Sequence, residues 1–335
     1  MCRFVNDEGK VLERFLGLKH IEKCTSIALK EALVDMISSH KLSMSMIRGQ
    51  GYDGASNMRG EFNGVQKLVR DQNPYAFYVH CFAHQLQLVV VAVSTSTPAI
   101  ADFFNYVPLI VNTVGASCMR KSFCDKNEIE VPDMDKEVNA RGTSVRRRQK
   151  VTNMHFYHVE IFLAVIDAIM SEMNHRFSEV SSELLVCMAC LNPRNSFSNF
   201  DVDKLVKFAE IYAEDFDIAE ITVLPSQLRG FIGCARRNQV FLGCTELSQV
   251  SEIMVKHGMH KSYPLVYRLI ELTLILLVAT VLVERIFLAM SIIKTDLRNK
   301  MGDEWLNDLM ICYTEKELFR NISNEKIIKR FNSKR

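Results

Sequence analysis

The glycine-rich segment 49–60 (GQGYDGASNMRG) most constrains how this chain can fold, because it places one acidic residue between two regions of different periodicity. Apolar residues alternate through 42–47, which predicts a β-strand, whereas residues 57–70 have the apolar spacing of a helix. Asp53 is therefore expected where a strand ends and a turn leads into a helix. A carboxylate in that position is well placed to bind a metal ion.

The regions around this segment predict more of a sheet. Polar residues 6–9 separate two short apolar segments, 3–5 and 10–16, as in a β-hairpin. Thr25 is expected to cap a helix that continues to about residue 39, and a further strand is expected at 76–80. This order of elements, hairpin, helix, strand, helix and strand, is typical of a mixed α/β fold in which helices flank a sheet.

The second half of the chain has the apolar spacing of helices. The expected helices begin near residue 154, near 184 and at 263, and the last of these is expected to continue through 283 to 297. A further amphipathic helix is expected at 303–319. The longest apolar run, 272–283, is about half the length that a bilayer requires, so we expect a buried helix and no membrane partner.

Composition excludes some classes of function. The chain has 335 residues, 48% of them hydrophobic, and a net charge of +2, so only local basic clusters at 141–150 and 326–335 could contact nucleic acid. Each cluster can equally be a solvated surface segment. Ten cysteines without an apolar leader predict a reducing compartment. No nucleotide-binding loop or catalytic triad is present, and no small-molecule substrate is expected.

Cys81 and His84 have the spacing of half a zinc site. Two pairs could supply the other half: Cys187 with Cys190, or His155 with His158. Both pairs lie in apolar predicted helices, where a cysteine often packs as a small apolar side chain. A structural role in the core is therefore the alternative interpretation of Cys81 and His84.

The segments 49–60 and 78–86, with 283–290 (VERIFLAM) and 297–301 (LRNKM), resemble transposases of the hAT superfamily. The resemblance is strongest to the plant zinc-finger-MYM-type-like group, which has a DUF4371 core and a C-terminal hAT dimerisation region. It covers nearly the whole chain in two blocks. It implies a ribonuclease H-like fold, a nuclear location, and a homodimer or a dimer with a full-length hAT relative.

The resemblance also implies the residues of a former catalytic site. Asp53 would be the second acid and Glu284 the third acid of a site that binds Mg²⁺ or Mn²⁺ for phosphoryl transfer. The first acid would lie on a central strand ahead of the hairpin, and we expect neither that strand nor its acid in this sequence. A large helical insertion would be shortened near residues 118–124. We therefore expect Asp53 and Glu284 close together in a truncated ribonuclease H-like sheet, no resident cofactor, and a chain that is catalytically inactive.

Four segments are expected. A partial ribonuclease H-like transposase core spans 1–120 and a polar basic linker 121–152. A helical remnant of the insertion spans 153–258 and the C-terminal dimerisation region 259–335. This last segment has more apolar residues than one helix face can bury, which predicts dimerisation.

Two alternative functions stay open. One is a metal-dependent DNA transposase or nuclease that uses Mg²⁺ or Mn²⁺ and a substitute acid such as Glu61 or Asp102. The other is a regulator that binds nucleic acid through its basic segments without cleaving it.

Overall fold

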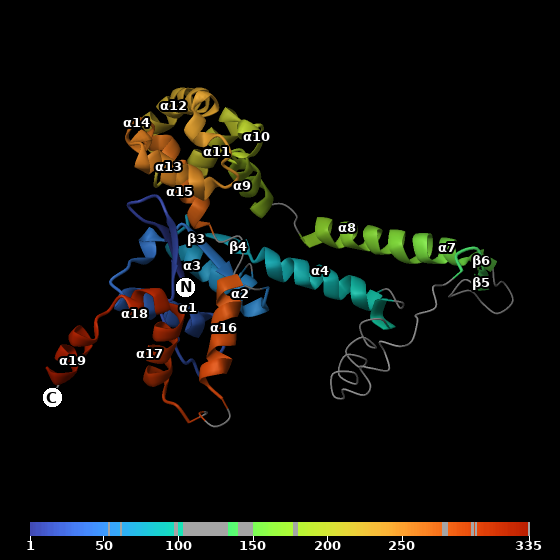
Figure 1. Cartoon of the computed structure of the whole chain (residues 1–335), viewed down its shortest axis with the longest axis horizontal. Coiled ribbons are helices and arrows are strands. Elements are labelled where there is room, and N and C mark those ends of the chain that lie inside the picture. Colours follow the sequence, from blue (N-terminus) through green and yellow to red (C-terminus); the bar gives the residue numbers. More distant parts are fainter. Residues whose placement is uncertain are drawn as a thin grey trace. The chain divides into compact units, whose positions relative to one another are not determined.

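The computed structural model describes residues 1–52, 54–60, 62–96, 100–102, 133–139, 150–176, 180–276, 281–295, 298 and 300–333. The fold is mixed α/β and mostly helical (Figure 1). The chain forms two compact units, which are described separately below. The first combines Met1–Ala83 with Glu179–Arg335, and the second is His84–Ser178.

The first unit begins with the predicted β-hairpin. β1 (Cys2–Val5) pairs antiparallel with β2 (Val11–Arg14), with Cys2 opposite Arg14. The turn needs a glycine, since Gly9 has a φ of 78° and a Cβ there would lie 2.7 Å from the Ser251 carbonyl oxygen. The tip of the hairpin therefore packs directly against α13 (Leu247–Lys256).

A second small sheet follows the predicted helix α1 (Ser26–Ser39), which Thr25 caps. β3 (Gly49–Tyr52) pairs in parallel with β4 (Phe77–His80). The buried Gln50 amide joins this sheet to its surroundings, because Nε2 donates to the carbonyls of Gln66 and Ala76 at 3.0 and 2.9 Å. The predicted strand at 76–80 and the helix capped by Thr25 are confirmed.

Two predictions around the glycine-rich segment are wrong. Residues 42–47 are not a strand: Met44–Met46 form a 3₁₀ turn (η1), whose first amide hydrogen bond goes from Ser45 to the Ser43 hydroxyl. The helix expected at 57–70 is divided into α2 (Ser56–Arg59) and α3 (Val65–Gln72). It breaks because the backbone turns tightly between two glycines, where a Cβ on Gly64 would lie 2.4 Å from the Gly60 nitrogen.

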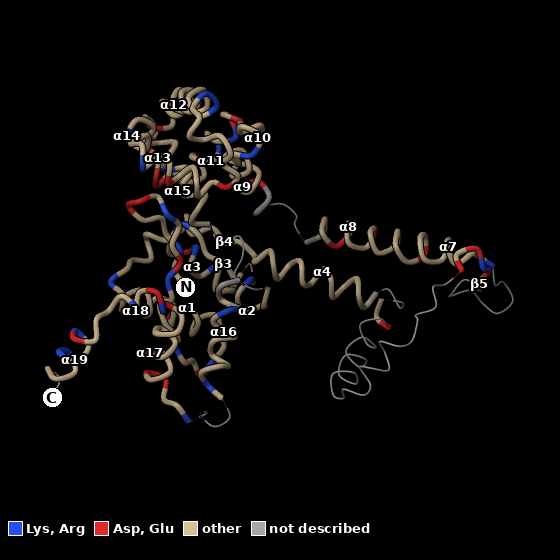
Figure 2. The backbone as a smooth tube through the Cα atoms, in the orientation of Figure 1, with Lys and Arg blue, Asp and Glu red and all other residues tan. Residues whose placement is uncertain are grey.

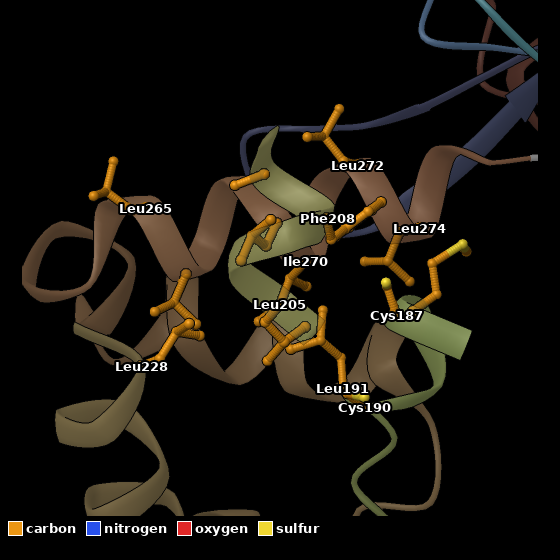
Figure 3. Close-up of a cluster of buried hydrophobic side chains, with 14 of the residues drawn as sticks. Cys187, Cys190, Leu191, Leu205, Phe208, Leu228, Leu265, Ile270, Leu272 and Leu274 are labelled. Atoms are coloured by element: carbon orange, nitrogen blue, oxygen red, sulfur yellow. The ribbon is translucent and has the colours of Figure 1, made fainter. Parts of the chain in front are cut away.

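A helical bundle forms the largest part of the first unit. Its elements are α9 (Val180–Ala189), α10 (Arg194–Phe197), α11 (Val202–Ile211), α12 (Ile218–Arg237), η4 (Gln239–Phe241), α13, α14 (Met259–Ser262) and α15 (Pro264–Ile275). Helix α15 runs through the main hydrophobic cluster, where its apolar side chains meet those of the surrounding helices (Figure 3). The buried residues of α15 are Leu265, Val266, Leu269, Ile270, Leu272 and Leu274.

The bundle and the two small sheets share one core. Val79 of β4 is buried in the same cluster as α15, and Val5 of β1 packs against it. Polar contacts join them as well: Arg48, just before β3, forms an ion pair with Asp215, and the Tyr212 hydroxyl donates to the Arg48 carbonyl at 3.1 Å. Helices and sheets therefore depend on each other for burial.

The last part of the first unit consists of α16 (Val281–Ile293), α17 (Asp303–Thr314), α18 (Lys316–Arg320) and α19 (Asn324–Asn332). α16 and α17 form a second, smaller core with Phe15, which follows β2. Hydrogen bonds join α17 and the residue after it to the segment that follows β2: the Phe15 amide donates to Glu315 Oε1 at 2.9 Å, and the Leu18 amide donates to Asn307 Oδ1 at 2.9 Å.

One long helix over 263–297 was expected, and this prediction is wrong. α15 ends at Ile275, and Leu276 is extended, with φ −68° and ψ 123°. The Leu276 side chain is buried beside β3, where its Cδ1 atom lies 3.0 Å from the position of a Cβ on Gly49. This tertiary contact draws the chain out of the helix before α16 begins.

The second unit contains two short strands, β5 (Glu137–Asn139) and β6 (Lys150–Thr152), which pair antiparallel. It also contains most of α4 (Phe82–Ser96) and one long helix. That helix comprises α7 (Asn153–His155), a π-helical segment η3 (Phe156–Leu163) and α8 (Ala164–Arg176). It confirms the helix predicted from residue 154. By length and composition alone, Asn153–His175 could cross a membrane, a test that helices of soluble proteins also pass.

The four sequence segments stay a prediction. The two compact units follow spatial contacts instead, and they place 1–83 and 179–335 together. Most of the expected linker 121–152 lies outside the described residues, although β5 and β6 fall within it.

Truncating Leu269 at the centre of α15 tests the importance of this helix. Leu269 is fully buried, so Leu269→Ala should lower the free energy of unfolding by about 2 to 5 kcal/mol. Leu242→Ala, at a residue that is 65% exposed, is the matched control and should change it by less than about 0.5 kcal/mol. Urea unfolding followed by circular dichroism measures both. Equal effects of the two substitutions would contradict the central place of α15.

Candidate functional site

The ends of β3 and β4 form the edge at which the sequence predicts the former catalytic site. Tyr52 lies opposite His80 in the parallel register, and the Cys81 amide donates to the Tyr52 carbonyl at 3.1 Å. Residues that follow the two strands therefore leave the sheet at the same edge. Asp53 itself lies outside the described residues, between Tyr52 and Gly54.

Aromatic rings occupy the end of this sheet. The Tyr52 and Tyr78 rings stack with centroids 6.1 Å apart, and the Tyr78 and His80 rings stack at 6.5 Å. Burial raises the pKa of Tyr52, so its phenol stays neutral at physiological pH. A Cβ on Gly54 would lie 2.9 Å from His80 Cε1, so the glycine after Asp53 allows the imidazole to lie close to the loop.

Glu284, which the resemblance makes the third acid, lies on α16 between Val283 and Arg285. The structure describes the helical backbone of Glu284 but not its side chain. The expected closeness of Asp53 and Glu284 therefore stays a prediction. The elements that carry the two acids have different neighbours: β3 lies beside Leu276, whereas α16 packs against α17 and Phe15.

The cysteine and histidine pairs lie on different elements. Cys81 is buried directly after β4, and His84 is in the first turn of α4. Cys187 and Cys190 are buried at the end of α9, where burial raises the pKa of both thiols and keeps them protonated. Over the described ranges, no three His, Cys, Asp or Glu side chains gather closely enough to hold a metal ion. A zinc site at Cys81 and His84 stays a prediction.

A cluster of charged residues lies where η1 and β3 meet the bundle. Arg48 is paired with Asp215, and Arg268 Nη1 donates to Glu220 Oε2 at 2.8 Å. Both arginines are thus occupied by carboxylates, which makes this cluster a link between elements and not an anion site. Glu271 lines a surface hollow together with Arg48, Asp215 and Arg268. Burial raises the pKa of Glu271, and the nearby charges of Arg268 and His260 partly offset this rise.

The other candidate site is an exposed apolar surface on α16 and α17. One side of α16 is covered, because Ile286, Ala289 and Ile293 lie in the second core. Its other side carries large apolar residues, and α17 adds a tryptophan. These residues form what we call the outer C-terminal surface: Phe287 (57% exposed), Leu288 (65%), Ile292 (61%) and Trp305 (64%).

This surface corrects the sequence-based prediction of which apolar residues are in surplus. Leu272 and Leu274 complete the main core, and Leu309 packs partly against the second core. The surplus begins only at α16. Leu288 was not singled out in the sequence, although its spacing of four residues from Ile292 places both on one helix face.

Comparison with known families supports the first block of the resemblance. Residues 1–64 match the family described as DUF4371, the ZMYM1/FAM200 RNase-like domain. The match includes the hairpin, α1, β3, Asp53 and α2. The N-terminal part of the chain is thus similar to an RNase-like domain, and the mixed α/β arrangement of strands and helices fits such a domain.

Glu271 predicts a specific dependence of stability on pH. In the folded chain the pKa of the Glu271 carboxyl lies above its ordinary value of 4.5. The free energy of unfolding should therefore fall as the pH rises from about 4.5 through the folded-state pKa. Glu271→Gln removes this loss, and its stability relative to the unmodified chain should increase from pH 4 to pH 8. The control Glu210→Gln, at an exposed residue, should show no such trend. Urea unfolding across this range measures the difference, and a difference independent of pH would contradict the assignment.

Proposed function

We propose that the chain is a transposase-derived protein of hAT type that is catalytically inactive and acts in the nucleus by protein dimerisation. The observation that carries this proposal is the outer C-terminal surface. Its partner is a second copy of this chain or a full-length relative with the same C-terminal helices. The match of residues 1–64 to an RNase-like domain family supports the transposase origin.

Leaving this apolar surface in water costs free energy that dimerisation would recover. Phe287, Leu288 and Ile292 project from two turns of one helix, and Trp305 lies on the helix packed beside it. Burying each large apolar side chain contributes about 1.5 to 3 kcal/mol. Tryptophan is also enriched among the residues that contribute most to protein interfaces. A two-fold dimer would bury the same surface on both copies.

The proposal assigns no chemical step to Asp53 and Glu284. Two-metal phosphoryl transfer uses about three converging carboxylates, and the resemblance supplies two of them in this sequence. We propose that these two acids are remnants of the ancestral site. Dimerisation does not require Mg²⁺ or Mn²⁺, and it does not require DNA or a small-molecule substrate.

A charge within the outer C-terminal surface tests dimerisation. Sedimentation equilibrium at micromolar concentration should show a dimer for the unmodified chain and a folded monomer for Leu288→Asp, because an unpaired carboxylate in an interface costs several kcal/mol. Leu288 is exposed within one chain, so the fold should be unaffected. Val223→Asp, at an exposed residue of α12, is the control and should remain dimeric. A monomeric unmodified chain would refute the proposal.

The absence of catalysis is tested with supercoiled plasmid DNA. In the presence of Mg²⁺ or Mn²⁺, the purified chain should nick the plasmid no faster than its Asp53→Asn variant. Gel electrophoresis over several hours measures the rate. Nicking by the unmodified chain that Asp53→Asn abolishes would favour the nuclease alternative instead.

A further inference from the structure

The last helix, α19, is amphipathic and has no buried residue. Its apolar residues Ile327, Ile328 and Phe331 are 42, 58 and 62% exposed. The Ser323 hydroxyl accepts from the Lys326 amide, so the helix begins at a defined cap. α19 is thus a defined helix whose apolar face is largely exposed to solvent within one chain.

α19 is also basic. Lys326, Lys329 and Arg330 outnumber its one acidic residue, Glu325, which gives the helix a net charge of +2. Arg330 lies one turn beyond Ile327, at the border of the apolar face, and the long basic side chains can reach around the helix. A partner surface for α19 should therefore be apolar with acidic residues beside it.

α17 has this complementary character. Its first half carries Asp303, Glu304 and Asp308, the helix has no basic residue, and Trp305 is exposed among the acids. Across the part of the chain that the structure describes, these three carboxylates form no ion pair. In Figure 2 the acidic first turn of α17 and the basic α19 lie at separate places along the C-terminal helices.

Within one chain, α19 leaves the acidic part of α17 uncovered, since Trp305 is 64% exposed. α17 has 12 residues and spans about 18 Å from its acidic start to its end. α18 continues from that end, fixed by the bonds of Glu315 to Arg14 and Phe15, and only residues 321–323 separate α18 from α19. α19 thus follows the end of α17 that is distant from Asp303 and Glu304, and no residue of α19 is buried within the chain.

We propose that α19 of one copy docks on α17 of a second copy. The apolar face of α19 covers Trp305, and the basic residues of α19 lie beside Asp308 and Glu304. In a two-fold dimer this exchange occurs twice and adds a peripheral contact to the outer C-terminal surface. The inference rests on the proposed dimerisation and deepens it by naming the element that is exchanged.

A charge-reversal pair tests the exchange. The first variant combines Lys326→Glu, Lys329→Glu and Arg330→Glu, and the second combines Glu304→Lys and Asp308→Lys. Each variant alone should dimerise at least tenfold more weakly than the unmodified chain, measured by sedimentation equilibrium. An equimolar mixture of the two should recover most of the lost affinity, because opposite charges then face each other at both contacts, reversed at one and native at the other. Circular dichroism verifies that each variant is folded.

A matched control separates this effect from a change in net charge. Arg229→Glu, Lys256→Glu and Lys261→Glu alter three exposed basic residues of the bundle and should leave the dimer unchanged. If both charge-reversal variants dimerise like the unmodified chain while Leu288→Asp is monomeric, the exchange is wrong and the dimer stands. If the unmodified chain is monomeric, both proposals fail.

Nucleic acid is the other partner that a basic helix could contact. Binding of the chain to a 20-base-pair DNA duplex, measured by fluorescence anisotropy, distinguishes a DNA contact of α19 from its docking on α17. The exchange predicts that the basic-to-acidic variant of α19 loses dimer affinity. Loss of duplex binding with unchanged dimer affinity would overturn the exchange in favour of a DNA contact.

Discussion

Burial of α15 is the constraint on which the rest of the first unit depends. Six of its side chains lie in the main core, and each contributes about 1.5 to 3 kcal/mol relative to exposure. The same cluster contains Val79 of β4 and reaches Val5 of β1. Two sheets of two strands each bury little surface alone, so their position against the bundle is part of their stability. A segment near the C-terminus thereby holds together strands near the N-terminus.

The end of α15 also determines what is left exposed. Leu276 leaves the helix to pack beside Gly49, and α16 then starts a separate core with Phe15 and α17. This second core covers one side of α16 only. The apolar residues on its other side are therefore not needed for folding within one chain, which is why we assign them to association between chains.

Local signals in the sequence were sufficient for the hairpin, for α1 and for β4, because a glycine turn, a threonine cap and apolar alternation each act over a few residues. β3 was misplaced because it consists of Gly49, Gln50, Gly51 and Tyr52, without a β-branched residue, and it is held by the contacts of Gln50 with Gln66 and Ala76. The break at Leu276 likewise depends on a residue more than 200 positions away. Of the candidate site, the sequence placed Asp53 after a strand and Glu284 on a helix, but helical periodicity could not tell which of the C-terminal apolar residues a second core would cover.

Hydrogen exchange at several protein concentrations tests dimerisation through α16 most directly. If the chain dimerises through α16, amides of α16 and α17 become more protected as the concentration rises from nanomolar to tens of micromolar, whereas amides of α12, in the bundle, do not change. Protection of α16 and α17 that is independent of concentration over this range would contradict it.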